Sequence, residues 1–321
     1  MDIILQIALL IVGFILLIKG ADFFVDGAAS TATNFKVSKT LIGLTIIAFG
    51  TSAPEFAVSI KALASGSTDM VLGNVIGSNI LNILLILGVA AVIRPLSIRK
   101  ETIRKEIPIC ILISSLLVVL FLDIQLNAAE INQITRSDRI AILLFFVIFL
   151  YYLISLALHS RDKKSAKPEK PKWKLGLSLL FTALGLVGII VGSNFVVDSA
   201  TKIASSIGIS ERVIALSVIA LGTSLPELVT TIVAAKKGET ELVLGNILGS
   251  NIFNICIVLG VPVALFGAVT PTSFSIIDLV ALIGSAVILF IFSITNHKIN
   301  RLEGGLMLLS FATYYTLVFI I

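Results

Sequence analysis

Two short segments place a glutamate in the middle of apolar runs. The first reads GTSAPE over 50–55 and the second reads GTSLPE over 222–227. An ionised glutamate near the centre of a bilayer costs about 2.5–3.5 kcal/mol even on the insertion scale, so Glu55 and Glu227 require a functional reason. The pair of carboxylates predicts a site for positive charge.

Hydroxyl groups accompany each glutamate. Thr51 lies four residues before Glu55 and therefore on the same helix face, with Ser52 beside that face, and the second segment repeats the arrangement. The four hydroxyl residues are Thr51, Ser52, Thr223 and Ser224. A single Ser or Thr in a span often bonds only to its own helix, but the duplication beside two carboxylates favours a cation site.

A proline precedes each glutamate. Pro54 and Pro226 have no N–H, so neither can bond the carbonyl four residues earlier, at Gly50 and Gly222. Such a break directs carbonyl oxygens away from the helix axis, which is tolerated in a membrane only where they line a cavity. The two prolines therefore predict broken helices that supply backbone oxygens.

A second pair of segments carries amides and more hydroxyls. Ser78 and Asn82 are four residues apart, and Ser250 and Asn254 match them in GNxxGSNxxN patterns whose glycines allow close helix approach. Pooling both pairs gives carboxylate, hydroxyl, amide and carbonyl oxygens without His or Cys. Such a set suits hard cations such as Ca2+ and Na+ and argues against Zn2+ or copper.

These segments belong to an internal repeat with an offset of 172 residues. Residues 13–88 and 185–260 are identical at 34 of 76 positions without a gap. Each half holds five apolar runs, and an odd number means that the second half enters the membrane from the opposite side. Inverted repeats with midplane sites at their interface are typical of secondary transporters.

The composition independently predicts a polytopic membrane protein. The 321 residues are 57% hydrophobic and 13% charged, with a mean hydropathy of +1.09, whereas soluble domains carry about 25% charged residues. We therefore expect an all-α fold of ten transmembrane helices arranged as two inverted five-helix repeats. The expected spans lie near 3–27, 40–64, 70–93, 106–122, 139–158, 175–200, 212–235, 242–266, 275–295 and 303–321.

The basic residues predict the orientation. Of 24 Lys and Arg residues, 18 fall in the connections after the odd-numbered spans. Because basic loops stay in the cytoplasm, we expect both termini outside and the linker 159–174 in the cytoplasm, in a multi-pass plasma-membrane protein. The expected organisation is a first repeat over 1–158 with its motif at 43–88, the linker, and a second repeat over 175–321 with its motif at 215–260. Cys110 and Cys256 are expected to be small core residues rather than a disulfide or metal pair.

With these motifs the chain resembles prokaryotic sodium/calcium exchangers of the Ca2+/cation antiporter superfamily over essentially its whole length. The resemblance implies alpha-repeat helices packed around four cation positions at mid-membrane. It implies cation ligands from both repeats, with carbonyl oxygens contributed by two alanines. These residues are Ala48, Thr51, Ser52, Glu55, Ser78, Asn82, Ala220, Thr223, Ser224, Glu227, Ser250 and Asn254. It also implies that spans one and six slide across the core in an outward–inward switch.

Departures from the family pattern bear on the coupling ion. Some archaeal members carry Asp where this chain has Asn254, and potassium-dependent members carry Asp at both positions matching Asn82 and Asn254, so two asparagines disfavour potassium coupling. The proton/calcium branch usually shows GNxxE rather than GTSxPE, which disfavours proton coupling. Cation/proton or K+-dependent exchange on the same scaffold remains the alternative.

Together these features predict a secondary antiporter that exchanges Ca2+ for Na+, without covalent chemistry or an organic cofactor. A passive channel would show a continuous polar stripe, whereas polarity here is confined to the middle of four spans. A membrane enzyme would need a nucleophile–base or metal set such as HExxH, and His159 and His297 both lie in expected loops. The expected partners are Ca2+, Na+ and the lipid bilayer, not nucleic acid. The oligomeric state is left open, with a monomer as one option.

Overall fold

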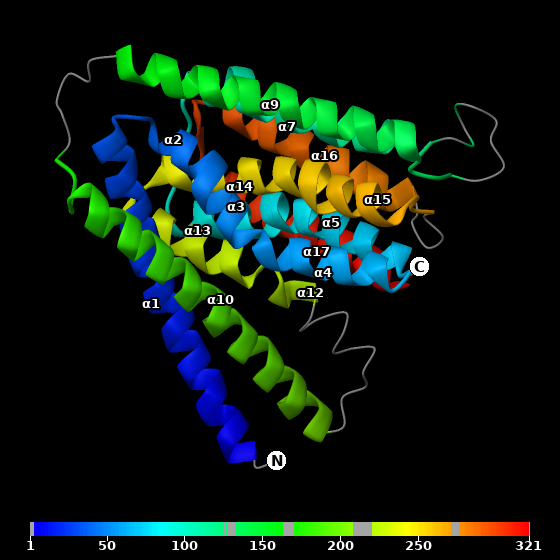
Figure 1. Ribbon diagram of the computed structural model, residues 1–321, viewed down its shortest axis with the longest axis horizontal. Coiled ribbons are helices and arrows are strands. Elements are labelled where there is room, and N and C mark those ends of the chain that lie inside the picture. The colour runs from blue at the N-terminus through cyan, green and yellow to red at the C-terminus, as the bar shows by residue number, and fades with distance from the viewer. Residues whose placement is uncertain are drawn as a thin grey trace.

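The computed structural model describes residues 3–122, 124, 126, 132–162, 170–207, 220–270 and 276–320, and it is built almost entirely of helices (Figure 1). Six described helices are long and apolar enough to cross a membrane, or seven if the bent pair Lys39–Thr51 and Ala53–Ala64 is one span. The polytopic all-α membrane class is therefore confirmed. The count of ten spans and their inverted orientation stay predictions.

The first half begins with the long helix α1 (Ile3–Phe35) and a broken segment made of α2 (Lys39–Ile42), the π-helix η1 (Gly43–Ile47), α3 (Ala48–Thr51) and α4 (Ala53–Ala64). It continues through α5 (Thr68–Leu81), the π-helix η2 (Asn82–Leu87) and α6 (Gly88–Ile93). The π-helix η3 (Thr102–Glu106), α7 (Ile107–Leu120) and α9 (Arg136–Asp162) complete it.

The second half repeats this order. The long helix α10 (Leu175–Ser206) precedes α12 (Ala220–Gly222) and α13 (Leu225–Lys237), followed by α14 (Thr240–Phe253), the π-helix η5 (Asn254–Leu259) and α15 (Gly260–Phe266). The last helices are α16 (Ile276–Ile294) and α17 (Arg301–Ile320). The expected seventh span and second motif begin before residue 220, and their first residues lie outside the described ranges, as does much of the linker.

The repeat is visible in local backbone geometry. Asn82 begins η2 and Asn254 begins η5, so a π-helical turn starts at the same repeat position in both halves. A π-turn shifts the side chains that follow it around the helix axis and is frequent at functional sites. The two halves thus share not only residue types but also the same irregularity in α5–α6 and α14–α15.

The helices are arranged as a central bundle with two kinds of cover (Figure 1). Helices α5 and α14 lie in the middle, and most of each span is buried. Helix α9 runs along one side of the bundle, while α1 and α10 run diagonally as a pair along another. The strongly buried α5 and α14 carry the GNxxGSNxxN segments, so the fold places both polar segments in its interior.

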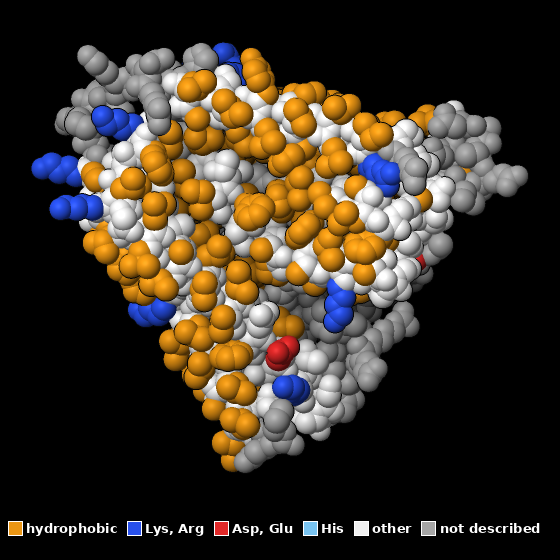
Figure 2. Space-filling model, viewed as in Figure 1, with side chains coloured by type: hydrophobic (Ala, Val, Ile, Leu, Met, Phe, Trp, Pro, Cys, Tyr) orange, Lys and Arg blue, Asp and Glu red, His pale blue; other side chains and the backbone are white. Residues whose placement is uncertain are grey.

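The surface of the protein is largely apolar, as contact with a lipid bilayer requires. Hydrophobic side chains cover most of the face in Figure 2, and the Lys and Arg side chains gather mainly at the end where α1 finishes and α10 begins. Apolar side chains on α9 such as Val147, Ile148 and Tyr151 are more than half exposed. Lipid contact accounts for this exposure, because water would penalise an apolar surface of this extent.

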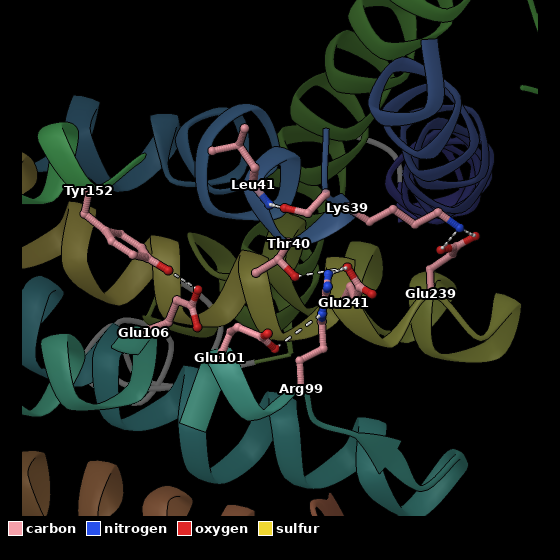
Figure 3. Close-up of polar contacts among 10 residues, drawn as sticks. Lys39, Thr40, Leu41, Arg99, Glu101, Glu106, Tyr152, Glu239 and Glu241 are labelled. Atoms are coloured by element: carbon pink, nitrogen blue, oxygen red, sulfur yellow. Dashed lines mark hydrogen bonds and ion pairs between the residues drawn. The ribbon is translucent and has the colours of Figure 1, made fainter. Parts of the chain in front are cut away.

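Polar contacts join the two halves at the end of the bundle where α1 finishes and α10 begins (Figure 3). This end is called the linker end below, because the linker 159–174 precedes α10. Lys39 pairs with Glu239 at 3.0 Å, and Arg99 pairs with Glu241 at 3.1 Å. Thr40 also donates a hydrogen bond to Glu241. At the same end β1 (Leu96–Ser97) pairs antiparallel with β2 (Lys298–Ile299), which ties the connection after α6 to the connection before α17.

Candidate cation site

The two predicted carboxylates meet in the centre of the bundle. Ser52 donates a hydrogen bond to Glu227 Oε1 at 2.9 Å, and Ser224 donates one to Glu55 Oε1 at 3.1 Å. Each glutamate is 1% exposed. Each carboxylate is therefore held by a serine from the other repeat, which places both repeats at one site.

Breaks in two helices bring the serines and glutamates into position. Helix α3 ends at Thr51 and α4 begins at Ala53, with a bend of 45° between the two segments. Ser52 occupies the break at φ −84° and ψ 7°, and Pro54 lies in the first turn of α4, where its missing N–H is not needed. Ser224 has nearly the same backbone conformation, at φ −91° and ψ 7°, before α13. The predicted broken helices are present in both halves.

The second pair of predicted segments lines the same region. Ser78 on α5 lies 3.4 Å from Ser224 through their hydroxyl oxygens, so α5 reaches the carboxylate pair. Ser250 and Asn254 on α14 and η5 are buried, as is Asn82 at the start of η2. Contacts between α4 and η5 and between α13 and η2 bring each amide segment against the glutamate helix of the other half.

Several buried oxygen atoms at this centre have no hydrogen-bond partner in the described protein. They include the second carboxylate oxygens, Glu55 Oε2 and Glu227 Oε2. The amide oxygens of Asn82 and Asn254 and the hydroxyl of Ser250 share this property. Buried polar atoms are normally satisfied, and both repeats leave matching acceptors unsatisfied, so the donor chemistry fits a hard cation.

The negative charge of the two glutamates also favours a cation site. Serine hydroxyls donate to the side chains of Glu55 and Glu227, and neither glutamate forms an ion pair with Lys, Arg or His within the described residues. A buried carboxylate without a cationic partner is costly. A bound metal cation would offset that cost for both residues at once.

The remaining predicted ligands are two threonines and two alanines of the broken helices. Thr51 is fully buried and donates to the carbonyl of Ile47 at 3.1 Å, while Thr223 is half-buried. The carbonyl of Ala48 accepts from the backbone N–H of Ser52 at 3.0 Å, so it is engaged with one of its two lone pairs. Ala220 begins α12, but its side chain falls outside the described part.

One carbonyl freed by a proline finds a partner that the sequence does not indicate. Ser193 on α10 donates a hydrogen bond to the carbonyl of Gly222 at 3.2 Å. This bond satisfies the acceptor that Pro226 leaves without a helical donor. It also connects α10 to the break before α13.

Two asparagines of the GNxxGSNxxN segments support the site, although the sequence interpretation did not select them. Asn74 donates to the carbonyl of Glu55 and to Ser59, both at 2.9 Å. Its repeat equivalent Asn246 accepts from Thr51 at 3.2 Å and donates to Thr231 at the same distance. The repeat offset of 172 residues was the available signal, since it matches Asn74 to Asn246.

A second matched pair joins the central helices directly. Asn82 donates to Asn251 at 3.0 Å, and Asn251 donates to the carbonyl of Asn79 at 3.2 Å. Asn79 and Asn251 are separated by the same repeat offset. They fix α5 against α14 between the two halves of the site. Cys110 and Cys256 are both buried, as expected of small core residues.

These observations define a class: a helical, polytopic membrane protein whose internal repeats meet at a buried oxygen cluster with two carboxylates. Sequence comparison gives the family. The chain matches the family described as "Sodium/calcium exchanger protein" over residues 5–155 and 177–320, and it belongs to that family.

Relatives and solved structures agree with this placement. The chain is 39% identical to the inner membrane protein YrbG of Escherichia coli, covering 84% of this chain and 83% of YrbG. It is 30% identical to the sodium/calcium exchanger MaX1 of Methanosarcina acetivorans, covering 98% of each chain. The structure of the sodium-calcium exchanger NCX_Mj soaked with 10 mM Na+ and 10 mM Sr2+ superimposes with a TM-score of 0.84 at 33% identity, covering 100% of this chain and 99% of that one. The resemblance stated from the motifs is confirmed.

Proposed function

We propose that this protein exchanges Ca2+ for Na+ across the membrane by alternating access at the cluster around Glu55 and Glu227. The observation that carries the proposal is the reciprocal Ser52–Glu227 and Ser224–Glu55 pairing of two buried carboxylates that have no basic partner among the described residues. Two carboxylates balance one Ca2+ or two Na+, so the two ions would compete for the same negative charge.

The ligands in this proposal are the residues expected from the motifs. The carboxylates supply the charge, and neutral oxygens complete the shell around ions that pass through it as substrates. The neutral set comprises side-chain oxygens of Thr51, Ser52, Ser78, Asn82, Thr223, Ser224, Ser250 and Asn254, and the carbonyls of Ala48 and Ala220. Buried oxygens without a partner among the described residues support this assignment at both glutamates, at both asparagines and at Ser250.

Asn74 and Asn246 have a positioning role in the proposal. The Thr51 hydroxyl proton has two acceptors within reach, the Asn246 amide oxygen and the Ile47 carbonyl, and the lone pairs of the hydroxyl oxygen remain available to an ion. Asn74 holds the backbone of Glu55 at the start of α4. Neither asparagine needs to touch the ion to set the geometry of the residues that do.

Movement of the α1–α10 pair across the bundle would expose the site alternately to the two sides. The support is the diagonal placement of this pair outside the central helices (Figure 1). We further propose a plasma-membrane location with both termini outside and the linker 159–174 in the cytoplasm. The support is the 18 of 24 basic residues in the odd-numbered connections.

The direct test is uptake of radioactive calcium into proteoliposomes under imposed gradients. An outward Na+ gradient should drive uptake, whereas H+ or K+ gradients set up without Na+ should not. Uptake driven equally well by a proton gradient would contradict Na+ coupling and favour cation/proton exchange. Calcium entry that follows its own gradient without a counter-ion would contradict antiport.

A further inference from the structure

Helices α1 and α10 form a single mechanical unit, because their backbones are in direct contact. A Cβ added at Gly185 would lie 2.5 Å from the backbone nitrogen of Phe24, and one added at Gly192 would lie 2.6 Å from that of Leu17. Such distances leave no room for any side chain between the two helices. The pair is therefore expected to move together rather than slide internally.

The end of the linker fastens the same two helices. The backbone N–H of Trp173 donates to Ser30 at 3.0 Å, and the Asn34 amide donates to the Trp173 carbonyl at 2.9 Å. Lys172 pairs with Asp26 at 2.6 Å. The start of α10 is thus tied to the last turns of α1 by hydrogen bonds and one ion pair.

One residue of the central bundle, Lys237, forms ion pairs with the α1–α10 unit. Lys237, at the end of α13, lies 2.8 Å from Asp26 Oδ1 and 3.3 Å from Asp22 Oδ1. Its ammonium group also donates to the Asp22 carbonyl at 2.8 Å. Within the described residues, Lys237 provides the ion pairs that connect the α1–α10 unit to the central bundle.

The internal repeat does not reproduce this contact at the opposite end. The offset of 172 residues matches Asp26 to Asp198 on α10, and Asp198 is exposed without an ion pair among the described residues. The same offset matches Lys237 to Ser65, whose hydroxyl donates to the carbonyl of Ala62. If the two halves exchanged conformations, the Lys237 contact would be lost at the linker end. No equivalent contact would form at the opposite end, because Ser65 carries no charge.

We propose that Lys237, with Asp22 and Asp26, forms a one-sided latch that holds the linker end of α1 against α13 and biases the transporter against opening at that end. The inference rests on the proposed alternating access. Lys237 and Asp26 are 27% and 22% exposed, so solvent weakens the pair without removing it. Loss of the latch should shift the balance between the two open states by about two- to fivefold.

The test compares Lys237→Gln with Lys236→Gln, because Lys236 is the neighbouring lysine on the same helix end and its side chain forms no described ion pair. Hydrogen–deuterium exchange should rise about two- to fivefold in the last turns of α1 and at the end of α13 in Lys237→Gln only. In oriented vesicles, the half-saturating Ca2+ concentration should fall at the linker face and rise at the opposite face. Lys237→Arg should restore both readings.

A gain-of-function variant tests the asymmetry. Ser65→Lys places a lysine at the repeat position that matches Lys237, where it could pair with Asp198 when the opposite end is closed. This variant should therefore move the ratio of half-saturating concentrations in the same direction as Lys237→Gln. Unchanged hydrogen exchange in Lys237→Gln relative to Lys236→Gln would overturn the latch, as would half-saturation values that rise equally at both faces. If the parent protein shows no calcium flux, the exchange function fails, while the hydrogen-exchange comparison still decides whether the latch exists.

Discussion

Two serines each donate a hydrogen bond to the carboxylate of the other repeat, and each serine therefore has two roles. Ser52 donates to Glu227 and Ser224 donates to Glu55. A hydrogen bond to a charged group contributes about 1.5–3 kcal/mol. Each serine therefore orients a carboxylate and, in the proposed site, offers its own oxygen to the ion.

Ser52→Ala should weaken Ca2+ binding about tenfold, because it removes an oxygen and releases one oxygen of Glu227. Calcium titration of the purified protein by calorimetry measures the change. Ser285→Ala is the matched control, since Ser285 is equally buried but donates to the carbonyl of Leu282 in its own helix. Equal calcium affinities for the two variants would show that Ser52 takes no part in binding.

Asn254→Asp tests whether the amide is a neutral ligand. Two carboxylates already balance one Ca2+, so a third negative charge should leave Na+-driven calcium flux measurable while changing its dependence on pH or K+. Flux in proteoliposomes at several pH values and K+ concentrations is the measurement. Complete loss of flux in a variant that elutes as one sharp species would contradict the neutral role of Asn254.

The residues proposed to contact an ion were easier to predict than those proposed to position them. A glutamate in an apolar span is conspicuous because its burial is costly, and Glu55 and Glu227 indeed lie together. Asn74 and Asn246 carry no charge, and an asparagine in a helix has many ordinary roles. Their contribution depends on contacts 15 or more positions away along the chain, with Ser59, Thr231 and Thr51, which no local pattern reveals.

At the scale of elements, the helix breaks could be predicted from the sequence, because proline has no N–H to donate within a helix. The bend between α3 and α4 falls two residues before Pro54, as the missing N–H predicts. The π-helical turns that begin at Asn82 and Asn254 did not follow, because a π-turn arises from tertiary packing rather than from a residue type. The close pairing of α1 with α10 was also not predicted, since small residues in an apolar run do not specify their partner helix.

Gly185→Ala should destabilise the protein by about 1–3 kcal/mol, because the new Cβ would lie 2.5 Å from the backbone nitrogen of Phe24 and 2.7 Å from the carbonyl oxygen of Gly20. Neither backbone atom can move without displacing α1. Thermal unfolding in detergent measures the loss, and Gly176→Ala on the same helix is the control, since nothing lies within 4 Å of its added Cβ. Equal melting temperatures would contradict direct backbone packing between α1 and α10.

At the scale of the whole molecule, the linker end is distinguished by its charge. Lys and Arg side chains concentrate there in Figure 2, and the ion pairs of Figure 3 join the halves at the same end. The composition and repeat predicted a polytopic membrane protein, which the apolar helices confirm. Which end faces the cytoplasm depends on insertion into a bilayer, and only the loop charges of the sequence bear on it.

Cysteine labelling tests this orientation. A cysteine at Ser165 in the linker should react with an impermeant reagent only from the cytoplasmic side, and a cysteine at Glu130 only from outside. Both variants are made after replacement of Cys110 and Cys256, which are buried and tolerate a small residue most readily. Labelling from the opposite side at both positions would contradict the proposed orientation.

The central claim is that Glu55 and Glu227 together bind the transported calcium ion, and calcium titration of glutamine variants tests it most directly. Glutamine keeps the size and one oxygen while removing the charge, so Glu55→Gln and Glu227→Gln should each abolish exchange and the double variant should show no calcium binding. Glu106→Gln is the matched control, because Glu106 is an equally buried glutamate that accepts a hydrogen bond from Tyr152 outside the cluster (Figure 3), and it should bind calcium like the parent. Calcium binding by the folded double variant at the parental affinity would contradict the claim.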